Sequence, residues 1–408
     1  MSTNWAGNVT FSAARTAHPT SVDEVRRVVE AAGSARVVGA GHSFSAIADT
    51  AGTLISLDRL PEVFEVGDGW VRVGAGTRLA RLAERLHAEG LALPAMPSLP
   101  HVTIIGACAT ATHGSGNDVP SLASLVRALD LVTADGGLVT LRRGDAGFDG
   151  AVVAFGSLGV VTALELDVVP TFDVEQRVYQ DMPFDVLVAN VEEVFASAYS
   201  VSAFTTWQGV AQVFAKHRTA DVRRDLAWTG ARPATGPVHP VPGQLAVNCT
   251  AQLGVPGPWH ERLPHFRADF TPSVGRELQS EYFVAREHAA DALRALDALS
   301  AVVTPVLLTS EVRTVAADEQ WLSPVHGRPS VALHFTWQPD DAAVRAVLRE
   351  VEAALSPWEP RAHWGKLSEV ADPGAGYEHW ARFAALRGEL DPAGKFGNPL
   401  VDGWFGGR

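Results

Sequence analysis

Two glycine-rich stretches, each containing one histidine, hold the residue types best suited to gripping a ligand. The first runs from Val37 to Ser45 and contains Gly39, Ala40, Gly41, His42, Ser43 and Phe44. The second runs from Gly106 to Gly116 and contains Thr112, His113, Gly114 and Ser115. Glycine has no Cβ, so backbone N–H groups in such turns can approach a ligand closely. Together the stretches predict a nucleotide-type site, although each histidine is also compatible with a turn residue bonded to backbone.

Neither stretch matches the common phosphate-binding motifs. The first lacks the third glycine that opens a helix in the Rossmann fingerprint, and no Gly-Lys-Ser/Thr follows as in a P-loop. The two cysteines, Cys108 and Cys249, are far apart in the chain. With no C-x-x-C, H-E-x-x-H or EF-hand pattern, the sequence predicts neither a disulfide framework nor a bound metal.

A second set of chemical groups falls on three later segments with the two-residue period of a strand. The period places on one face Thr309, Glu311 and Arg313 in 304–314, His334, Thr336 and Gln338 in 331–338, and Trp364 and Lys366 in 362–367. Buried charges are costly unless they are paired or functional. The pattern therefore predicts a polar site on one sheet, or alternatively a solvated sheet face carrying cross-strand ion pairs.

The first 170 residues alternate helices with short strands. Ser21 and Glu24 form a capping-box pattern for a helix reaching about Ala32. A second helix is expected to be capped by Thr77 and to end at Gly90. Short strands are expected at 36–38, 53–57 and 70–73, a hairpin at 125–132 and 138–141, and a glycine turn leading into a strand at 156–169 that ends at Pro170. This alternation favours an α+β or α/β unit.

After Thr171 the strands lengthen and alternate with covering helices. Strands are expected at 201–208, 211–217, 279–286, 305–314 and 331–338, and helices at 184–197, 288–299 and 340–355. This order is typical of an antiparallel sheet with helices on one face. The Gly-rich, aromatic segment from Asp391 to Gly407 is expected to dock against another part of the chain.

Composition narrows the possible partners. The 408-residue chain has a formal net charge of −13 and no basic run, which argues against a nucleic-acid surface. It has no uninterrupted apolar run of the length that spans a bilayer, and the N-terminus lacks a secretory signal pattern. The expectation is a cytoplasmic monomer without a membrane or nucleic-acid partner.

Four segments resemble one known family in their order and spacing. They are VVGAGHSFS at 37–45, PSLPHVTIIGACATATHGSG at 97–116, GSLGVVTALEL at 156–166 and DPAGKFGN at 391–398. Together they resemble the vanillyl-alcohol-oxidase-type flavoproteins, in particular the alditol oxidases, with the aldonolactone oxidases as relatives. The resemblance extends over nearly the whole chain.

The resemblance implies a two-domain FAD-binding fold with an antiparallel-sheet cap domain over the substrate. Residues 1–170 would form the FAD-binding domain and 171–375 the cap, with 376–408 packing back on the FAD-binding domain. His42 would carry FAD covalently through the 8α-methyl group. The residues implied to line the cofactor are Gly39, Ala40, Gly41, His42, Ser43, Phe44, Ser98, Gly106, Thr112, His113, Gly114, Ser115, Gly116, Val161 and His363.

For the substrate, the resemblance implies a polyol pocket formed by Ser98, Glu311, Arg313, His334, Thr336 and Lys366. The chemistry of these residues is compatible: His334 is the candidate base, Arg313 and Lys366 can stabilise an alkoxide, and Glu311, Ser98 and Thr336 can bind hydroxyls. The implied reaction oxidises a terminal alcohol of xylitol or sorbitol to the aldose and reduces O2 to H2O2. Alternatives are an aldonolactone oxidase, a dehydrogenase with another electron acceptor, or a sugar-binding protein without turnover.

Overall fold

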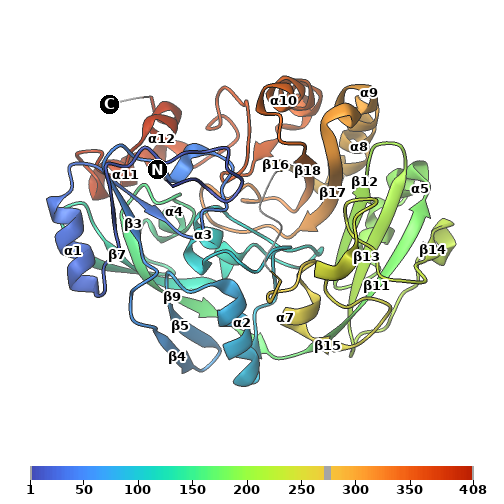
Figure 1. Cartoon of the computed structure of the whole chain (residues 1–408), viewed down its shortest axis with the longest axis horizontal. Helices are drawn as coiled ribbons and strands as arrows, with labels where there is room; N and C mark the ends of the chain where they lie inside the picture. Colours follow the sequence, from blue (N-terminus) through green and yellow to red (C-terminus); the bar gives the residue numbers. More distant parts are fainter. Residues whose placement is uncertain (1, 271–276, 407–408) are drawn as a thin grey trace.

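The computed structural model describes residues 2–270 and 277–406. Two sheet-containing parts lie side by side (Figure 1). The N-terminal elements form the left part, and a large sheet formed by later residues fills the right part. The last helices, α11 (Trp380–Leu390) and α12 (Pro399–Trp404), return to the left part near α1 (Val22–Ala31). The chain thus has the mixed helix-and-strand composition that the sequence predicts.

The N-terminal part contains two small sheets. In the first, β1 (Arg15–Ala17), β3 (Thr53–Ser56) and β2 (Ala35–Val38) are parallel. The second is antiparallel and has the order β4-β5-β9-β7-β8. Its strands are β4 (Phe64–Gly67), β5 (Trp70–Gly74), β7 (Val126–Val132), β8 (Leu138–Arg142) and β9 (Val160–Asp167). Strand β2 leads directly into the first glycine loop, and helix α3 (Ile104–Ala109) lies within the second glycine-rich stretch.

The large sheet follows the order β14-β11-β13-β12-β17-β18-β16-β19, with β15 beside β11. The strands are β11 (Asp173–Met182), β12 (Ser200–Thr205), β13 (Val210–Arg218), β14 (Arg232–Pro233), β15 (Gly257–Pro258), β16 (Leu278–Ala285), β17 (Leu307–Val315), β18 (Ser330–Trp337) and β19 (Arg361–Ala362). Its pairings are antiparallel, as predicted.

One face of the large sheet is covered by helices. These are α5 (Phe184–Ala189), α6 (Val191–Phe195), α8 (Ala289–Asp297) and α10 (Asp341–Leu355), of which α5, α8 and α10 are labelled in Figure 1. Val312 of β17 and Leu333 of β18 pack there against Leu293 of α8 and Val351 of α10 in one apolar core. Because side chains alternate along a strand, the neighbouring residues of β17 and β18 point to the other face. The helices therefore leave the polar face of the sheet directed toward the N-terminal part.

Several local predictions are corrected by the structure. The helix expected at 184–197 is two short helices, α5 and α6, because the Asn190 side chain donates to the Val186 carbonyl at 2.8 Å and interrupts the first helix. Helix α2 (Leu79–Ala88) starts after Arg78, not at a Thr77 cap. Strand β11 was not expected, since the buried polar Gln176 hides its apolar alternation.

Ser21 caps α1 as predicted, since its side chain accepts from the Glu24 N–H. The reciprocal bond differs, because the Glu24 carboxylate accepts from Thr20 N–H at 2.7 Å rather than from Ser21. Strand β2 and the 126–142 hairpin also form as predicted. No helix in residues 2–270 and 277–406 is long and apolar enough to cross a bilayer.

The segment after α11 contacts three places in the N-terminal part. Lys395 Nζ donates to the carbonyls of Val29 and Ala134, both at 2.7 Å. Asn398 Nδ2 donates to the carbonyls of Ala46 at 3.0 Å and Asp49 at 2.9 Å. The Asn398 side chain also caps α12 by accepting from Val401 N–H at 2.9 Å. The end of this segment, Gly407, lies outside the described residues.

Candidate active site

A cavity lies between the two glycine stretches and the polar face of the large sheet. From the first stretch and its surroundings it is lined by Gly39, Ala40, Gly41, His42, Ser43, Phe44 and Ser98, and from the second by Gly106, Thr112 and His113. From the sheet side it is lined by Thr309, Glu311, Arg313, His334, Thr336, His363 and Lys366. Residues more than 300 positions apart in the sequence thus face one space.

Four residues implied by the resemblance do not line this cavity: Gly114, Ser115, Gly116 and Val161. Ser115 and Gly116 instead bind the second stretch to the large sheet. The Ser115 hydroxyl donates to the Val201 carbonyl, and Gly116 N–H donates to the Thr314 carbonyl at 2.8 Å. Val161 lies in β9, paired with Leu131.

The two glycines of the first loop are required for different reasons, a close side chain at Gly39 and a left-handed backbone at Gly41. A Cβ on Gly39 would lie 2.3 Å from Thr103 Oγ1, and Gly41 has a φ of +71°, a conformation that side chains rarely adopt. Thr103 is the N-cap of α3, where its Oγ1 accepts from Gly106 N–H at 3.3 Å. The two glycine stretches are therefore held against each other by one threonine, and their backbones border the same cavity.

His42 is not a turn histidine bonded to backbone. Its ring lies against Trp5, with ring centroids 5.1 Å apart, and the described residues give its nitrogens no hydrogen-bond partner. Burial, with smaller contributions from Arg78 and His101, lowers the pKa of His42 to about 4. The side chain is thus a neutral imidazole on the cavity wall, the form in which a ring nitrogen has a lone pair available for bonding.

His113 is both a turn histidine bonded to backbone and a candidate ligand-binding residue. Its Nδ1 lies 2.7 Å from the Gly114 carbonyl, which is the contact of a turn histidine. Its Nε2 is buried without a hydrogen-bond partner among the described residues and lies 3.4 Å from Glu281 Oε1. Buried polar atoms are nearly always hydrogen-bonded, so Nε2 is an atom that a ligand can satisfy.

The polar face of the sheet is buried rather than solvated. Glu311, Arg313, His334 and Thr336 are each between 3% and 7% exposed. At the centre of this face lies Glu281 of β16, at 1% exposure. The solvated-face alternative is therefore wrong, and the cross-strand ion pairs it invoked are present but buried.

Glu281 binds two cations at once. Its Oε2 accepts from Lys366 Nζ at 2.8 Å and its Oε1 from the Arg313 guanidinium. Burial alone would raise the pKa of Glu281, but the charges of Lys366 and Arg313 outweigh it and hold that pKa well below the ordinary range. The carboxylate is thus ionised, and it fixes two positive groups beside the cavity.

Lys366 also contacts the histidine of the neighbouring strand. Its Nζ lies 2.9 Å from His334 Nδ1, and His334 Nε2 lies 3.2 Å from the Thr336 hydroxyl. Burial lowers the pKa of Lys366, opposed by Glu281. Burial, followed by the charge of Lys366, lowers the pKa of His334 to about 3. An amine and an imidazole with lowered pKa values, in direct contact at a cavity wall, can exchange a proton with a ligand.

The sequence patterns miss several cavity residues and misplace two, Trp364 and Gln338. Glu277, Gln279 and Glu281 line the cavity from the start of β16, and the two-residue period applied to the predicted strand at 279–286 would have found Glu281. Trp364 does not share a face with Lys366, because β19 ends at Ala362. Trp364 instead donates to the Leu322 carbonyl at 2.7 Å. Gln338 is exposed beyond the end of β18.

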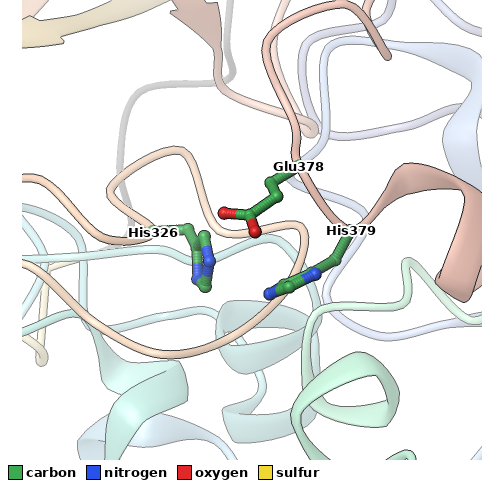
Figure 2. Close-up of side chains that lie close together, drawn as sticks. All are labelled: His326, Glu378 and His379. Atoms are coloured by element: carbon green, nitrogen blue, oxygen red, sulfur yellow. The ribbon is translucent and has the colours of Figure 1, made fainter.

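Outside the cavity, His326, Glu378 and His379 point toward one another (Figure 2). Their ligand atoms lie within 4.8 Å of one another, and no other group of three His, Cys, Asp or Glu side chains in residues 2–270 and 277–406 is as close. Arg361 donates to the His326 carbonyl at 2.9 Å, and His379 precedes the N-terminus of α11. Both features place positive charge beside the cluster, and no motif spacing connects its residues in the sequence.

Comparison with known proteins agrees with the cavity and the fold. The FAD binding domain family matches residues 13–142, and the D-arabinono-1,4-lactone oxidase family matches residues 272–404. Two cholesterol oxidases, one of them from B. sterolicum, share the fold, with TM-scores of 0.78 and 0.77 at 17% and 14% identity over 98% of this chain and 96% of theirs. The fold and the cavity thus define an FAD-dependent oxidoreductase of the vanillyl-alcohol-oxidase type.

Relatives in sequence narrow this class. The chain is 52% identical to the alditol oxidase of Streptomyces sp., over 98% of this chain and 97% of that protein. It is 30% identical to L-gulono-1,4-lactone dehydrogenase of Mycobacterium tuberculosis over 95% of both chains, and 26% identical to L-gulonolactone oxidase of Mus musculus over 98% of this chain and 97% of that protein. The chain belongs to the alditol oxidase family within the FAD-dependent oxidases.

Proposed function

We propose that this protein oxidises the terminal primary alcohol of an alditol, such as xylitol or sorbitol, to the aldose and reduces O2 to H2O2. The observation that carries the proposal is the group formed by the buried residues Glu311, Arg313, His334 and Thr336 and the half-buried Lys366 on the cavity wall opposite the glycine loops. A polyol offers many hydroxyls, and this wall offers both donors and acceptors for them. The 52% identical relative named alditol oxidase supports the same substrate class.

The cavity fits FAD at its glycine-lined end. Gly39, Gly41 and Gly106 let a ligand approach the backbone closely. The buried Nε2 of His113 has no hydrogen-bond partner among the described residues. When bound there, FAD would supply the hydride acceptor for the substrate and the electron transfer to O2. We propose that residues 1–170 and 376–408 hold the cofactor, that 171–375 cover it, and that the neutral imidazole of His42 attaches it covalently through the 8α-methyl group.

Lys366 and His334 can take up the hydroxyl proton of the substrate. When the Lys366 amine is uncharged, it accepts the Nδ1 hydrogen of His334, and the lone pair of His334 Nε2 can then accept a proton. When the amine is charged, it donates to Nδ1, and Nε2 carries a hydrogen instead. Burial lowers the pKa of Lys366, so its amine loses the proton at a lower pH than an ordinary lysine does, and in that uncharged form of Lys366, His334 can act as the base.

Arg313 is placed to stabilise the oxygen that loses this proton. Its Nε is buried and has no hydrogen-bond partner among the described residues. A donor held in this way costs no reorganisation when negative charge develops on a substrate oxygen. Ser98 and Thr336 can donate to or accept from the remaining hydroxyls, and Glu311 can only accept.

The test is an anaerobic mixing experiment that follows the flavin absorbance with xylitol, sorbitol and galactonolactone. We expect reduction by the polyols and H2O2 release when air is admitted. Reduction by the lactone alone would favour an aldonolactone oxidase, a candidate supported by the 30% and 26% identical relatives. Reduction by a polyol without peroxide would indicate a dehydrogenase, and no reduction by any compound would leave only binding.

The covalent bond is tested separately by acid precipitation. We expect the yellow colour to stay with the precipitated protein, and to be released into the supernatant for His42→Ala. Colour fully released from the unaltered protein would overturn the linkage. Colour retained by His42→Ala would assign the bond to another residue.

A further inference from the structure

We propose that Lys216, which lies behind the cavity, and His265, which lines it, form a positioning relay that orients Glu311 and keeps one of its carboxylate oxygens free for a substrate hydroxyl. The proposal rests on the proposed function and adds two residues to it. Neither Lys216 nor any neighbour of it on β13 was singled out by the sequence. His265 follows α7 (Trp259–Arg262), in a segment that belongs to none of the strands of the large sheet.

The three side chains form one continuous hydrogen-bonded line. His265 Nε2 lies 2.9 Å from Glu311 Oε1, and His265 Nδ1 lies 3.2 Å from Lys216 Nζ. Lys216 Nζ also donates to the Leu263 carbonyl. Lys216 is 1% exposed and His265 5% exposed, so both are shielded from bulk water. His265 and Glu311 line the cavity, and Lys216 does not.

The chemistry of the donors gives the line a fixed direction. An ammonium group has hydrogens but no acceptor, so His265 Nδ1 must accept from Lys216. The single ring hydrogen of the neutral imidazole is then on Nε2 and is donated to Glu311. Burial lowers the pKa of His265 to about 4, which keeps the ring neutral.

The donor-to-acceptor direction of these hydrogen bonds stays the same when Lys216 loses its charge. Burial lowers the pKa of Lys216 to about 7, with Glu311 opposing the shift. An uncharged amine still has two hydrogens, enough for the Leu263 carbonyl and His265 Nδ1, and the Glu311 carboxylate, which can only accept, keeps the ring hydrogen on Nε2. Phe204 and Phe214 stand edge-on to the His265 ring, each with centroids 5.3 Å away. These two rings hinder the imidazole from turning over.

The relay occupies only one oxygen of Glu311. Among the described residues, the contacts to this carboxylate at His265 and at Arg313 Nε, 3.7 Å away, are both made to Oε1. Oε2 is left for the cavity, which Glu311 lines. A carboxylate oxygen can only accept a hydrogen bond, so the free Oε2 of Glu311 selects a substrate group that donates one, such as a hydroxyl. The relay should therefore act on substrate binding and much less on the step that reduces the flavin.

A matched pair of variants tests this inference. His265→Gln places an amide donor near the position of Nε2 and can still reach Glu311, whereas His265→Asn reaches only the Nδ1 side. In anaerobic stopped-flow, with whichever of xylitol, sorbitol or galactonolactone reduces the unaltered flavin, the dissociation constant and the limiting reduction rate are measured separately. We expect His265→Asn and Lys216→Met to weaken binding about tenfold or more, as the loss of a hydrogen bond to a charged group implies.

His265→Gln should bind substrate within about threefold of the unaltered protein, and all limiting rates should stay within a similar factor. Equal binding by the Gln and Asn variants, or a fall confined to the limiting rate, would overturn the relay. Crystal structures of the two variants give a readout without substrate: Glu311 should keep its position in His265→Gln and move in His265→Asn. If no compound reduces the flavin, the proposed function fails, while these structures still decide the relay.

Discussion

Replacing Glu281 with glutamine tests the electrostatic centre of the site most directly. The substitution keeps the shape of the side chain and removes the charge that holds Lys366 and Arg313. A unit-charge pair at the Lys366 distance of 2.8 Å attracts by about 6 kcal/mol at an effective dielectric constant of about 20. Desolvation cancels much of this, and breaking a buried pair by removing one partner typically costs about 3–5 kcal/mol. We expect a loss of that size in the free energy of unfolding.

The assay is urea denaturation of the holoprotein followed by tryptophan fluorescence, with Glu277→Gln as the matched control. Glu277 also lines the cavity, but the described residues place no cation in a salt bridge with it. Among residues 2–270 and 277–406 its side chain accepts from Gln279 Nε2 at 2.8 Å, and burial raises its pKa. Its charge is therefore a cost to folding, and the control should be as stable as the unaltered protein or slightly more. Equal midpoints for both variants would refute the assignment of Glu281 as the anion that holds the cluster.

Three further outcomes are expected. The rate of anaerobic flavin reduction by a polyol should rise as the pH passes through the lowered pKa of Lys366. At lower pH the rate should be lost, because the charged amine leaves a hydrogen on His334 Nε2. A rate that does not change from pH 5 to 10 would exclude Lys366 and His334 as the base. Lys366→Met should lower that rate by about 10²–10³ and flatten the profile, and an unchanged rate would remove Lys366 from the site. Cys108 and Cys249 are buried, and burial raises their pKa values to about 12 and about 11. A disulfide reagent at pH 8 should therefore label neither thiol until urea is added. Rapid labelling of the folded protein would contradict their burial.

How far the sequence predicts the structure depends on whether a residue acts within its own segment. The capping by Ser21, the strand before Gly39 and the alternation of Glu311 with Arg313 are local properties, and each is present as predicted. Glu281 could be predicted only by also predicting which strands pair, because it becomes important where β16 pairs with β18 and places it opposite His334. Lys216 and His265 could not be found from local pattern, since they meet only when β13 and the 263–268 segment pack together. Trp364 was misplaced because the sequence does not show where β19 stops.

The hydrogen bonds from Asn398 to the carbonyls of Ala46 and Asp49 join positions 352 and 349 residues apart. A contact of such sequence separation closes late, because the entropy of bringing the ends together must be overcome first. A ribosome makes residues 46–49 long before Asn398, so the nascent chain has the first glycine loop without this support. The proposed attachment of the cofactor at His42 is accordingly expected to follow translation. Removal of the segment from Asn398 onward would take this support from residues 46–49 and leave the large sheet intact.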